Sequence, residues 1–302
     1  MNWPYALRLP RVAADLLKEP LGLVGPGRAG RAFARSWTGA GGRVGWVLGR
    51  TRRAPALGDA ETLSSDAERF PPAGLVVLAV PDDAVRGVAE AIASRAACHH
   101  AFHLAGALGS DALAPLRARG AAVASFHPVR PFVGAPDEDL RGALVAVEGD
   151  VAAVEAGHAL AERFGALPYR LAATDRARYH AAATLAAGGT AAIVSVAVRN
   201  WVAIGIPEDV ARETLAGLAA RAAAAVAARA FTEAFTGAVA RRDAGTVRGH
   251  VAALSREPET LALYRALAEE TLARTAGAGR EEEIRAILLA AQPSPARNPT
   301  AS

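Results

Sequence analysis

Residues 21–37 read LGLVGPGRAGRAFARSW, a short apolar run followed by a glycine-rich turn and an amphipathic segment. Gly25, Gly27 and Gly30 occupy the glycine positions of a G-x-G-x-x-G pattern. In such a turn the first glycine allows the tight bend, the second lets the backbone approach a pyrophosphate, and the third lets the helix pack on the strand. The stretch therefore predicts a strand, a phosphate-binding turn and a helix, in that order.

The start of the predicted helix agrees with a phosphate site, because free N–H groups and the positive end of the helix dipole favour an anion there. A second stretch, VVLAVPDDAV at residues 76–85, is an apolar run that leads to Val80 and Pro81 at the predicted ligand edge of the sheet. A tight turn without a ligand is the alternative. The candidate cofactor-binding residues in these stretches are Gly25, Pro26, Gly27, Arg28, Ala29, Gly30, Val80 and Pro81.

The residues after the second predicted strand indicate which dinucleotide binds. An NAD site needs an acidic side chain there for the ribose 2′-hydroxyl, but no Asp or Glu occurs from Pro20 through Gly58. Arg50, Thr51 and Arg52 follow the strand instead, and guanidinium and hydroxyl groups suit a 2′-phosphate. We therefore predict NADP(H) as the cofactor, with an exposed arginine loop as the alternative.

Short apolar runs alternate with helical patterns between residues 21 and 147, which is typical of βαβ units. Helices are expected to begin near Arg28, Asp82, Ser110 and Asp150. The sequence predicts an α/β fold whose N-terminal Rossmann domain has a doubly wound, mostly parallel sheet. The predicted strands are Leu21–Val24, Val44–Leu48, 75–80, 101–104, 121–126 and 144–147, with a last short strand at 168–171.

After Thr174 the pattern changes to long alanine-rich helical segments with few breakers, so a second, all-helical domain is expected. One helix should cover residues 175–203, Pro207 should lie just inside the next, and Asp243 and Pro258 should open two more. The predicted organisation is an N-terminal extension over residues 1–19, the Rossmann domain over 20–172, a helical substrate and dimerisation domain over 173–291, and a disordered tail over 292–302.

Composition and charge argue against several classes of function. The 302 residues include 34 basic and 30 acidic side chains, and a net charge of +4 is too small to indicate nucleic-acid binding. No uninterrupted apolar run reaches the roughly 18 residues of a membrane span, and no signal peptide is visible, so a cytoplasmic protein is expected. The single cysteine, Cys98, has no neighbours at metal-ligand spacing, so we expect a buried thiol and no metal site.

Six motifs follow one another along the chain: GLVGPGRAG, VVLAVPDDAV, HLAGALGSDAL, SFHPVRPF, DRARYHAAATLAA and FTGAVARRDAGTVRGHVAAL. In this order they resemble the domain of unknown function 2520 family. The resemblance implies a Rossmann-like domain followed by a helical domain like the C-terminal domain of 6-phosphogluconate dehydrogenase. It also implies similarity to pyrroline-5-carboxylate reductases, ketopantoate reductases and β-hydroxyacid dehydrogenases. Those enzymes pass hydride between NADP(H) and a small C=O or C=N compound, commonly as dimers with intertwined helical domains.

Two positions depart from the pattern of the family. Relatives usually read FHPLQTF where residues 126–132 read FHPVRPF, so Arg130 and Pro131 replace a polar pair. Relatives usually read YHAAAVLASNY where this chain has Gly188 at the position of the Asn. In the wider superfamily an Asn on this helix often helps to hold the substrate. This chain would have to bind a substrate without that amide.

A reductase must supply a proton or a hydrogen bond to the heteroatom of its product, and a histidine can do either. His180 lies near the start of the long predicted helix, and Thr184 follows at i+4 on the same face. His127 follows a predicted strand, where it can approach the ligand edge or simply pack. We predict His180 as the donor, Thr184 as a substrate contact, and His127 and Arg130 as orienting groups. A histidine hydrogen-bonded at a domain interface is the alternative.

Two functions stay open at this point. The first is an NADP(H)-dependent oxidoreductase that transfers hydride to or from a small carbonyl or imine compound. The second is an NADP(H)-binding protein without turnover, a sensor or a partner of another protein, which the missing amide at Gly188 would fit. A homodimer through the helical domain is expected, because residues 175–203 are apolar around much of the helix and must bury that surface. Burial by helices of the same subunit is the alternative.

Overall fold

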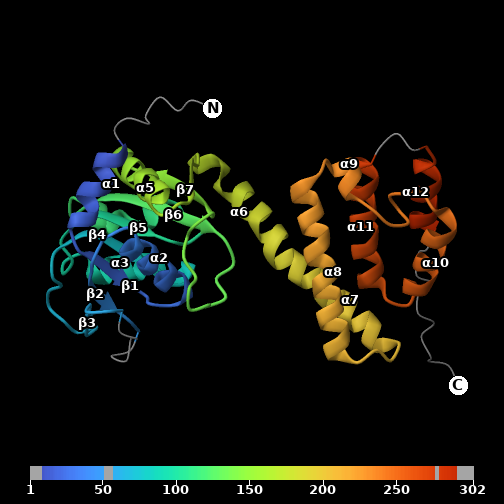
Figure 1. Cartoon of the computed structure of the whole chain (residues 1–302), viewed down its shortest axis with the longest axis horizontal. Helices are drawn as coiled ribbons and strands as arrows, with labels where there is room; N and C mark the ends of the chain where they lie inside the picture. Colours follow the sequence, from blue (N-terminus) through green and yellow to red (C-terminus); the bar gives the residue numbers. More distant parts are fainter. Residues whose placement is uncertain (1–8, 51–56, 276–278, 291–302) are drawn as a thin grey trace, which may run out of the picture. The chain divides into compact units, whose positions relative to one another are not determined.

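The computed structural model describes residues 9–50, 57–275 and 279–290 of the chain, shown in Figure 1. The chain divides into two compact units, Met1–Ala187 and Gly188–Ser302. The first unit contains every strand of the described residues, and the second contains only helices and their connections. The predicted fold class, an α/β Rossmann domain followed by an all-helical region, is confirmed.

The described strands form one sheet in the order β3-β2-β1-β4-β5-β6-β7-β8. They are β1 Leu21–Val24, β2 Val44–Leu48, β3 Glu61–Leu63, β4 Ala73–Leu78, β5 Cys98–His103, β6 Ala122–Val129, β7 Leu144–Gly149 and β8 Leu167–Arg170. Neighbouring strands are parallel except β6 and β7, which are antiparallel. The strand order reverses between β1 and β4. In doubly wound sheets, ligands bind at this point, outside the carboxyl ends of the strands.

Helices cover both faces of this sheet, so the central strands are buried on both sides (Figure 1). One face packs against α1 Leu9–Lys18, α2 Arg28–Gly39 and α5 Val151–Arg163. The other packs against α3 Val85–Ile92, the 3₁₀ helix η2 Ser110–Leu113 and α4 Ala114–Arg117. This double burial explains why the strands read as continuous apolar runs and not as alternating ones.

Several strands differ in extent from the prediction, and the differences in β4 and β6 affect the site. β4 ends at Leu78, so Val80 and Pro81 lie in the loop beyond the strand. β6 continues past its predicted end at residue 126 and includes His127 and Pro128. β6 pairs with β5 only as far as Ser125, and beyond it pairs with β7 alone. A proline is tolerated there because one side of the strand has no neighbour that needs its N–H.

Several elements were not predicted. The N-terminal extension contains α1, which packs on α5, and β3 adds a short edge strand beside β2. Helix α12, Glu281–Ala290, follows the last predicted helix, whereas the helix predicted near Asp82 is present as the 3₁₀ helix η1 Asp82–Ala84 followed by α3. These are short segments or lie at an edge of their unit. Sequence periodicity is weakest over such lengths.

The predicted long helix is present, but its middle is not α-helical. A short 3₁₀ turn, Ala173–Asp175, leads into α6 Arg176–Thr184, which is followed by a π-helical segment, Leu185–Gly189, and then by α7 Thr190–Ala203. The π segment contains Gly188, the position where relatives have Asn. Single π turns inside α-helices occur frequently at functional sites.

The helical unit continues with α8 Glu208–Ala228, α9 Phe231–Ala234, α10 Ala244–Leu254 and α11 Pro258–Arg274. The predicted starts near Pro207, Asp243 and Pro258 are confirmed to within one residue. Helices α10, α11 and α12 enclose a core of their own. By contrast, α7 has no buried residue among those described, although it packs along α8.

One helix has the length and composition that a membrane span requires. It runs over Ala173–Ala203, and its most apolar window has a mean hydropathy of 1.8 and no buried residue. The sequence analysis excluded a membrane span because no uninterrupted apolar run was long enough. That criterion was too strict, because small polar residues interrupt the run without adding charge. A single helix of this kind is weak evidence for a membrane, since core helices meet the same criteria.

Candidate functional site

The three glycines of the first motif each take the role that the sequence predicts. Gly25 has a φ of +88°, and a Cβ added to it would lie 2.4 Å from the backbone oxygen of Ala79. A Cβ on Gly30 would lie 2.3 Å from the oxygen of Gly25. Gly27, in contrast, has open space around the place of its missing Cβ. The turn thus has no room for side chains at Gly25 and Gly30. It leaves open space at Gly27, as close approach of a phosphate requires.

The first turn of α2 is free to receive an anion. Gly27 is the N-cap residue and provides no side chain, so no side-chain oxygen caps the helix. Arg28 is exposed, while Pro26 is buried and its carbonyl accepts a hydrogen bond of 3.0 Å from Nε of Arg31. The geometry of Pro26, Arg28 and the half-buried Ala29 therefore suits the predicted pyrophosphate site.

Val80 and Pro81 lie beside this turn. Cγ1 of Val80 is 3.0 Å from the place of a Cβ on Gly25, so the loops after β1 and β4 meet where the strand order reverses. Arg50 is exposed just after β2, which is the predicted place for contact with a 2′-phosphate. Thr51 and Arg52, which were predicted to share that contact, lie outside the described residues.

A second cluster gathers residues from three motifs at the ends of β5 and β6. His127 comes from β6, and His180 and Tyr179 come from α6. The hydroxyl of Tyr179 and Nδ1 of His127 form a hydrogen bond of 2.7 Å. The ring centroids of His127 and His180 are 5.9 Å apart, and the ring planes are inclined at 70°. A Cβ on Gly106, in the loop after β5, would lie 2.5 Å from Nδ1 of His180 and 2.7 Å from Nε2 of His127.

Burial controls the charge of this cluster. Burial, followed by the nearby His180 and Arg176, lowers the pKa of His127 from 6.5 to about 4, so the imidazole is neutral near pH 7. Burial also raises the pKa of Tyr179 to about 12, so its phenol keeps its proton. Nδ1 of His180 is buried and has no hydrogen-bond partner among the described residues.

An ion pair that the sequence analysis missed holds the cluster together. Arg176 is 5% exposed, and its guanidinium donates to Glu148 at 3.0 Å and to the backbone oxygen of Gly106 at 3.2 Å. Glu148 also accepts hydrogen bonds from the backbone and the hydroxyl of Ser110, each at 2.9 Å. The network ties the start of α6 to β7 and to the loop after β5. Arg176, Gly106 and Ser110 lie in quoted motifs, but Glu148 lies in none, and nothing in the sequence indicated the pairing.

The other two predicted site residues are not drawn into this cluster by any described contact. Arg130 is half-buried and donates a hydrogen bond from Nη1 to the backbone oxygen of Asp139. Thr184 is exposed on α6, one turn beyond His180. Their roles toward a substrate stay predictions. His103, which was not predicted, is fully buried, and its Nε2 lies 3.0 Å from the backbone oxygen of Gly109.

Among the described residues, no group of three or more His, Cys, Asp or Glu side chains could hold a metal ion. Cys98, expected to be buried, is half-buried at the start of β5. Burial raises the pKa of its thiol to about 11, which keeps the thiol protonated near neutral pH.

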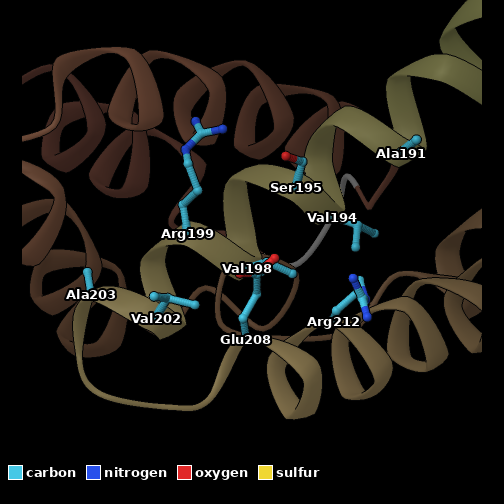
Figure 2. Close-up of a pocket in the computed structure, with 9 residues that line it drawn as sticks. All are labelled: Ala191, Val194, Ser195, Val198, Arg199, Val202, Ala203, Glu208 and Arg212. Atoms are coloured by element: carbon cyan, nitrogen blue, oxygen red, sulfur yellow. The ribbon is translucent and has the colours of Figure 1, made fainter.

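The helical unit has a groove of about 580 Å³ between α7 and α8, shown in Figure 2. Its apolar lining comes from successive turns of α7, including Val194, Val198 and Val202. Arg199, Glu208 and Arg212 bring charge to its borders. None of the predicted catalytic or cofactor-binding residues lines it.

Two family models match the sequence. The model of the Rossmann-like domain matches residues 10–128, and the model of the Domain of unknown function (DUF2520) matches residues 143–271. A comparison with curated proteins finds no match. The matched segments contain five of the six motifs completely, which supports the predicted resemblance.

Solved structures share the fold at low sequence identity. A candidate NADP oxidoreductase from Bacteroides fragilis is 21% identical with a TM-score of 0.68, and the match covers 86% of this chain and 100% of that one. A Thermotoga maritima protein is 20% identical with a TM-score of 0.69, covering 84% and 98%. A Plasmodium falciparum pyrroline carboxylate reductase with NADP bound is 12% identical with a TM-score of 0.51, covering 86% and 100%.

At these identities the structural likeness establishes the fold and not the reaction. The family models add the relationship that the motifs predicted, because they match consecutive parts of the chain in the expected order. Residues 143–271 therefore match the DUF2520 family model, and they follow a match to a Rossmann-like domain over residues 10–128.

Proposed function

We propose that this chain is an NADP(H)-dependent oxidoreductase that transfers hydride to or from a small carbonyl or imine compound. The observation that carries the proposal is that two sites share one edge of the sheet. The glycine turn follows β1, and the pair His127 and His180 lies where β5 and β6 end. In doubly wound sheets, cofactor and substrate meet at this edge. The names of two structural relatives, which refer to NADP, support the same class of reaction.

The residues of the glycine turn fit a dinucleotide. Gly27 leaves open the space that a pyrophosphate needs, and the uncapped start of α2 can donate hydrogen bonds to it. Arg28 would add positive charge there, and Arg50 with Thr51 and Arg52 would bind the 2′-phosphate. When bound, NADP(H) supplies or accepts a hydride through its nicotinamide ring.

The protein's own contribution to the reaction would be to handle the proton. In this proposal His180 donates to the heteroatom of the product, and His127 orients it. Thr184 would contact the substrate from the same helix. Arg130 donates one N–H group to the backbone oxygen of Asp139. Its remaining N–H donors would bind an acidic group of the substrate.

Cofactor preference tests the first half of the proposal. Fluorescence titration should show tighter binding of NADPH than of NADH, because the 2′-phosphate pairs with the arginines after β2. The double variant Arg50→Ala with Arg52→Ala should lose at least tenfold in NADPH affinity, and NADH affinity should hardly change. Arg69→Ala, which removes an exposed arginine elsewhere in the same unit, is the control. Equal affinities for the two dinucleotides would rule out the assignment.

Turnover tests the second half. NADPH oxidation should be followed with a panel of small keto acids and cyclic imines. With a substrate so identified, His180→Ala should reduce turnover by roughly a hundredfold and leave NADPH affinity nearly unchanged. Full activity of this variant would remove His180 from the mechanism.

A second function is favoured by one observation, the glycine at position 188. Without an amide at this position the chain would bind NADP(H) without turnover, as a sensor or as a partner of another protein. Tight NADPH binding with no oxidation across the whole panel would support this alternative. Both functions fit a cytoplasmic location, where NADP(H) is available.

We also propose that the chain forms a homodimer through its helical unit. The apolar surface of α7 and of the groove beside α8 is too extensive to stay in contact with water, since Ile193, Val202 and Leu218 are 37%, 42% and 55% exposed. A twofold interface also needs self-complementary charge. Arg199 and Arg212 on one copy can pair with Glu208 on the other across such an interface.

A further inference from the structure

Tyr179 and His127 form a hydrogen-bonded pair whose geometry determines where the proton lies. The tyrosine hydroxyl is 2.7 Å from Nδ1 of His127, and the two rings are nearly perpendicular, at 89°. A phenol is a good donor and a poor acceptor, whereas an unprotonated imidazole nitrogen is a good acceptor. Among the described residues the Tyr179 hydroxyl has no other hydrogen-bond partner. The hydroxyl therefore donates, and Nδ1 of His127 accepts.

The charge states of both groups support this direction. The pKa of Tyr179 is raised to about 12 by burial, so the phenol has a hydrogen to donate. The pKa of His127 is lowered to about 4, first by burial, so its imidazole carries a single hydrogen near pH 7. With Nδ1 occupied as an acceptor, that hydrogen lies on Nε2.

Nε2 of His127 lies near a nitrogen of His180 that lacks a partner, in rings whose centroids are 5.9 Å apart. Nδ1 of His180 is buried without a hydrogen bond among the described residues. Both nitrogens approach the α-carbon of Gly106, at 2.7 Å and 2.5 Å from the place of its missing Cβ. A small ring rotation or one bridging water lets the Nε2–H group of His127 donate to Nδ1 of His180. His180 then keeps its hydrogen on its own Nε2.

We infer that Tyr179 and His127 are positioning residues that hold His180 with its hydrogen on Nε2, ready to donate to the oxygen of a carbonyl substrate. The inference rests on the proposed function and narrows its substrate class. A carbonyl oxygen accepts a hydrogen bond from this N–H group. A protonated imine presents an N–H of its own, and two donors facing each other repel.

The same chain of hydrogen bonds can return the proton. In the direction of reduction, hydride adds to the carbonyl carbon and the π electrons of the C=O bond become a lone pair on oxygen. The oxygen takes the hydrogen from Nε2 of His180, whose Nδ1 takes one from Nε2 of His127. Nδ1 of His127 takes the hydrogen of the Tyr179 hydroxyl, which water replaces, and both imidazoles return from the Nδ1–H to the Nε2–H tautomer by proton exchange with water before the next turnover. The net change is the addition of one hydride and one proton to the carbonyl group.

Nitrogen NMR of the full chain tests the tautomers without any substrate. In ¹⁵N-histidine-labelled protein, long-range ring couplings distinguish Nε2–H from Nδ1–H imidazole, and His127→Gln and His180→Gln assign the two signals. Both rings should be Nε2–H tautomers in the unmodified chain. Tyr179→Phe should turn His127 into a mixture of tautomers and shift the signals of His180. An Nδ1–H tautomer at His127, or histidine signals that Tyr179→Phe leaves unchanged, would overturn the inference.

The helical unit provides a matched control. The pair His250 and Tyr264 has its rings at the same 5.7 Å and 89° as His127 and Tyr179, with a hydrogen bond of 3.0 Å. Tyr264→Phe should therefore change the signals of His250 and leave those of His127 and His180 as they were. If Tyr264→Phe also changed the signals of His127 and His180, the effect of Tyr179→Phe would reflect a general perturbation of the protein. That result would overturn the inference.

Kinetics test the substrate class separately. Pairs of carbonyl compounds and cyclic imines of similar size should show NADPH oxidation with the carbonyl member. Tyr179→Phe should then lower kcat roughly tenfold, with little change in KM for NADPH. Turnover of the imines alone would overturn the inferred substrate class and leave the oxidoreductase proposal standing. No oxidation with either class would overturn the proposed function, while the NMR result would still decide the tautomers.

Discussion

Gly106 sets the distance between the loop after β5 and the two imidazoles of the site. An added Cβ would meet Nδ1 of His180 and Nε2 of His127 at 2.5 Å and 2.7 Å, closer than any real contact allows. Gly106→Ala should therefore displace at least one ring and reduce turnover tenfold or more. NADPH affinity should stay within about twofold, because the glycine turn is a separate element. Steady-state kinetics and fluorescence titration measure both.

The control for this prediction adds the same methyl group elsewhere in the unit. Gly87 is exposed in α3 and has open space around the place of its missing Cβ. Gly87→Ala should leave turnover unchanged and stabilise the helix slightly, since alanine is the better helix former. Unimpaired turnover in Gly106→Ala would mean that the two rings do not act at the places described.

The low pKa of His127 makes stability depend on pH. Burial, followed by the charges of His180 and Arg176, lowers this pKa from 6.5 to about 4, whereas Asp82 opposes the shift. The unfolded chain then binds a proton at this position more readily than the folded chain. The contribution of His127 to stability is therefore fully present above about pH 6.5. It is lost as the pH falls toward about 4.

Urea denaturation at a series of pH values measures this loss. The free energy of unfolding should fall as the pH drops below about 6.5, and His127→Asn should make the fall shallower. It should not abolish the fall, because burial also lowers the pKa values of His100, His103 and His158. An identical pH dependence in the variant and the unmodified chain would contradict the assignment.

For single residues, the sequence predicted those features that depend only on the local backbone. The tight turn at Gly25 and the close packing at Gly30 follow from one local motif, and the structure has both, with open space at Gly27. The contact of His127 with Tyr179 joins residues 52 positions apart, and that of Arg176 with Glu148 joins residues 28 apart. Such pairings depend on how strands and helices are placed in the sheet, and no spacing rule encodes them.

Among the elements, the start of α10 shows how a single side chain can join several helices. Arg242 is 2% exposed and has a positive φ of 54°. Its guanidinium donates to the hydroxyl and backbone oxygen of Thr275, after α11, and to Glu281 at the start of α12. Arg242→Ala should lower the free energy of unfolding of the helical unit by about 3 kcal/mol, because it removes one partner of a buried ion pair. Urea denaturation followed by circular dichroism measures the change.

The neighbouring Arg241 provides the control, because it is exposed. Arg241→Ala should change the free energy of unfolding by less than about 0.5 kcal/mol. Equal effects of the two substitutions would show that the buried network contributes nothing specific to the packing of α10, α11 and α12.

Elements were predictable where their pattern is long and regular. The parallel strands and the helix starts at Asp243 and Pro258 carry strong signals, and the structure confirms them. The π segment Leu185–Gly189 was not predictable, because its residues fit an α-helical pattern equally well. The extension of β6 through Pro128 was also missed, since the tolerance for that proline depends on β5 ending first.

For the whole molecule, the exposed apolar surface of α7 and α8 predicts association. Light scattering at micromolar concentration should give twice the chain mass of 31.0 kDa. Val198→Glu places a charge in the groove of Figure 2 and should shift the mass toward that of one chain. Val133→Glu is the control, because Val133 is 71% exposed, belongs to the first unit and does not line the groove. A mass of 31.0 kDa for the unmodified chain would exclude the dimer.

The overall organisation could be predicted because each half of the chain has one dominant pattern. Alternating apolar runs and turns mark the first unit, and alanine-rich helices mark the second. Contacts between residues divide the chain into two units after Ala187, inside the long helix. Sequence patterns predicted a boundary near residue 172, where the strands end. Secondary structure changes there, whereas packing changes only farther along the same helix.

The uncovered surface of α7 also gives the molecule an optical reporter. Trp201 is half-buried near the end of α7, whereas Trp37 and Trp46 are fully buried in the first unit. Indole emission moves to shorter wavelength when water leaves its surroundings. Dilution that separates two copies should therefore shift the emission of Trp201 to the red, and the same dilution of Trp201→Phe measures the background from Trp3, Trp37 and Trp46. The helix whose surface the fold leaves bare thus carries a tryptophan that can report when that surface is covered.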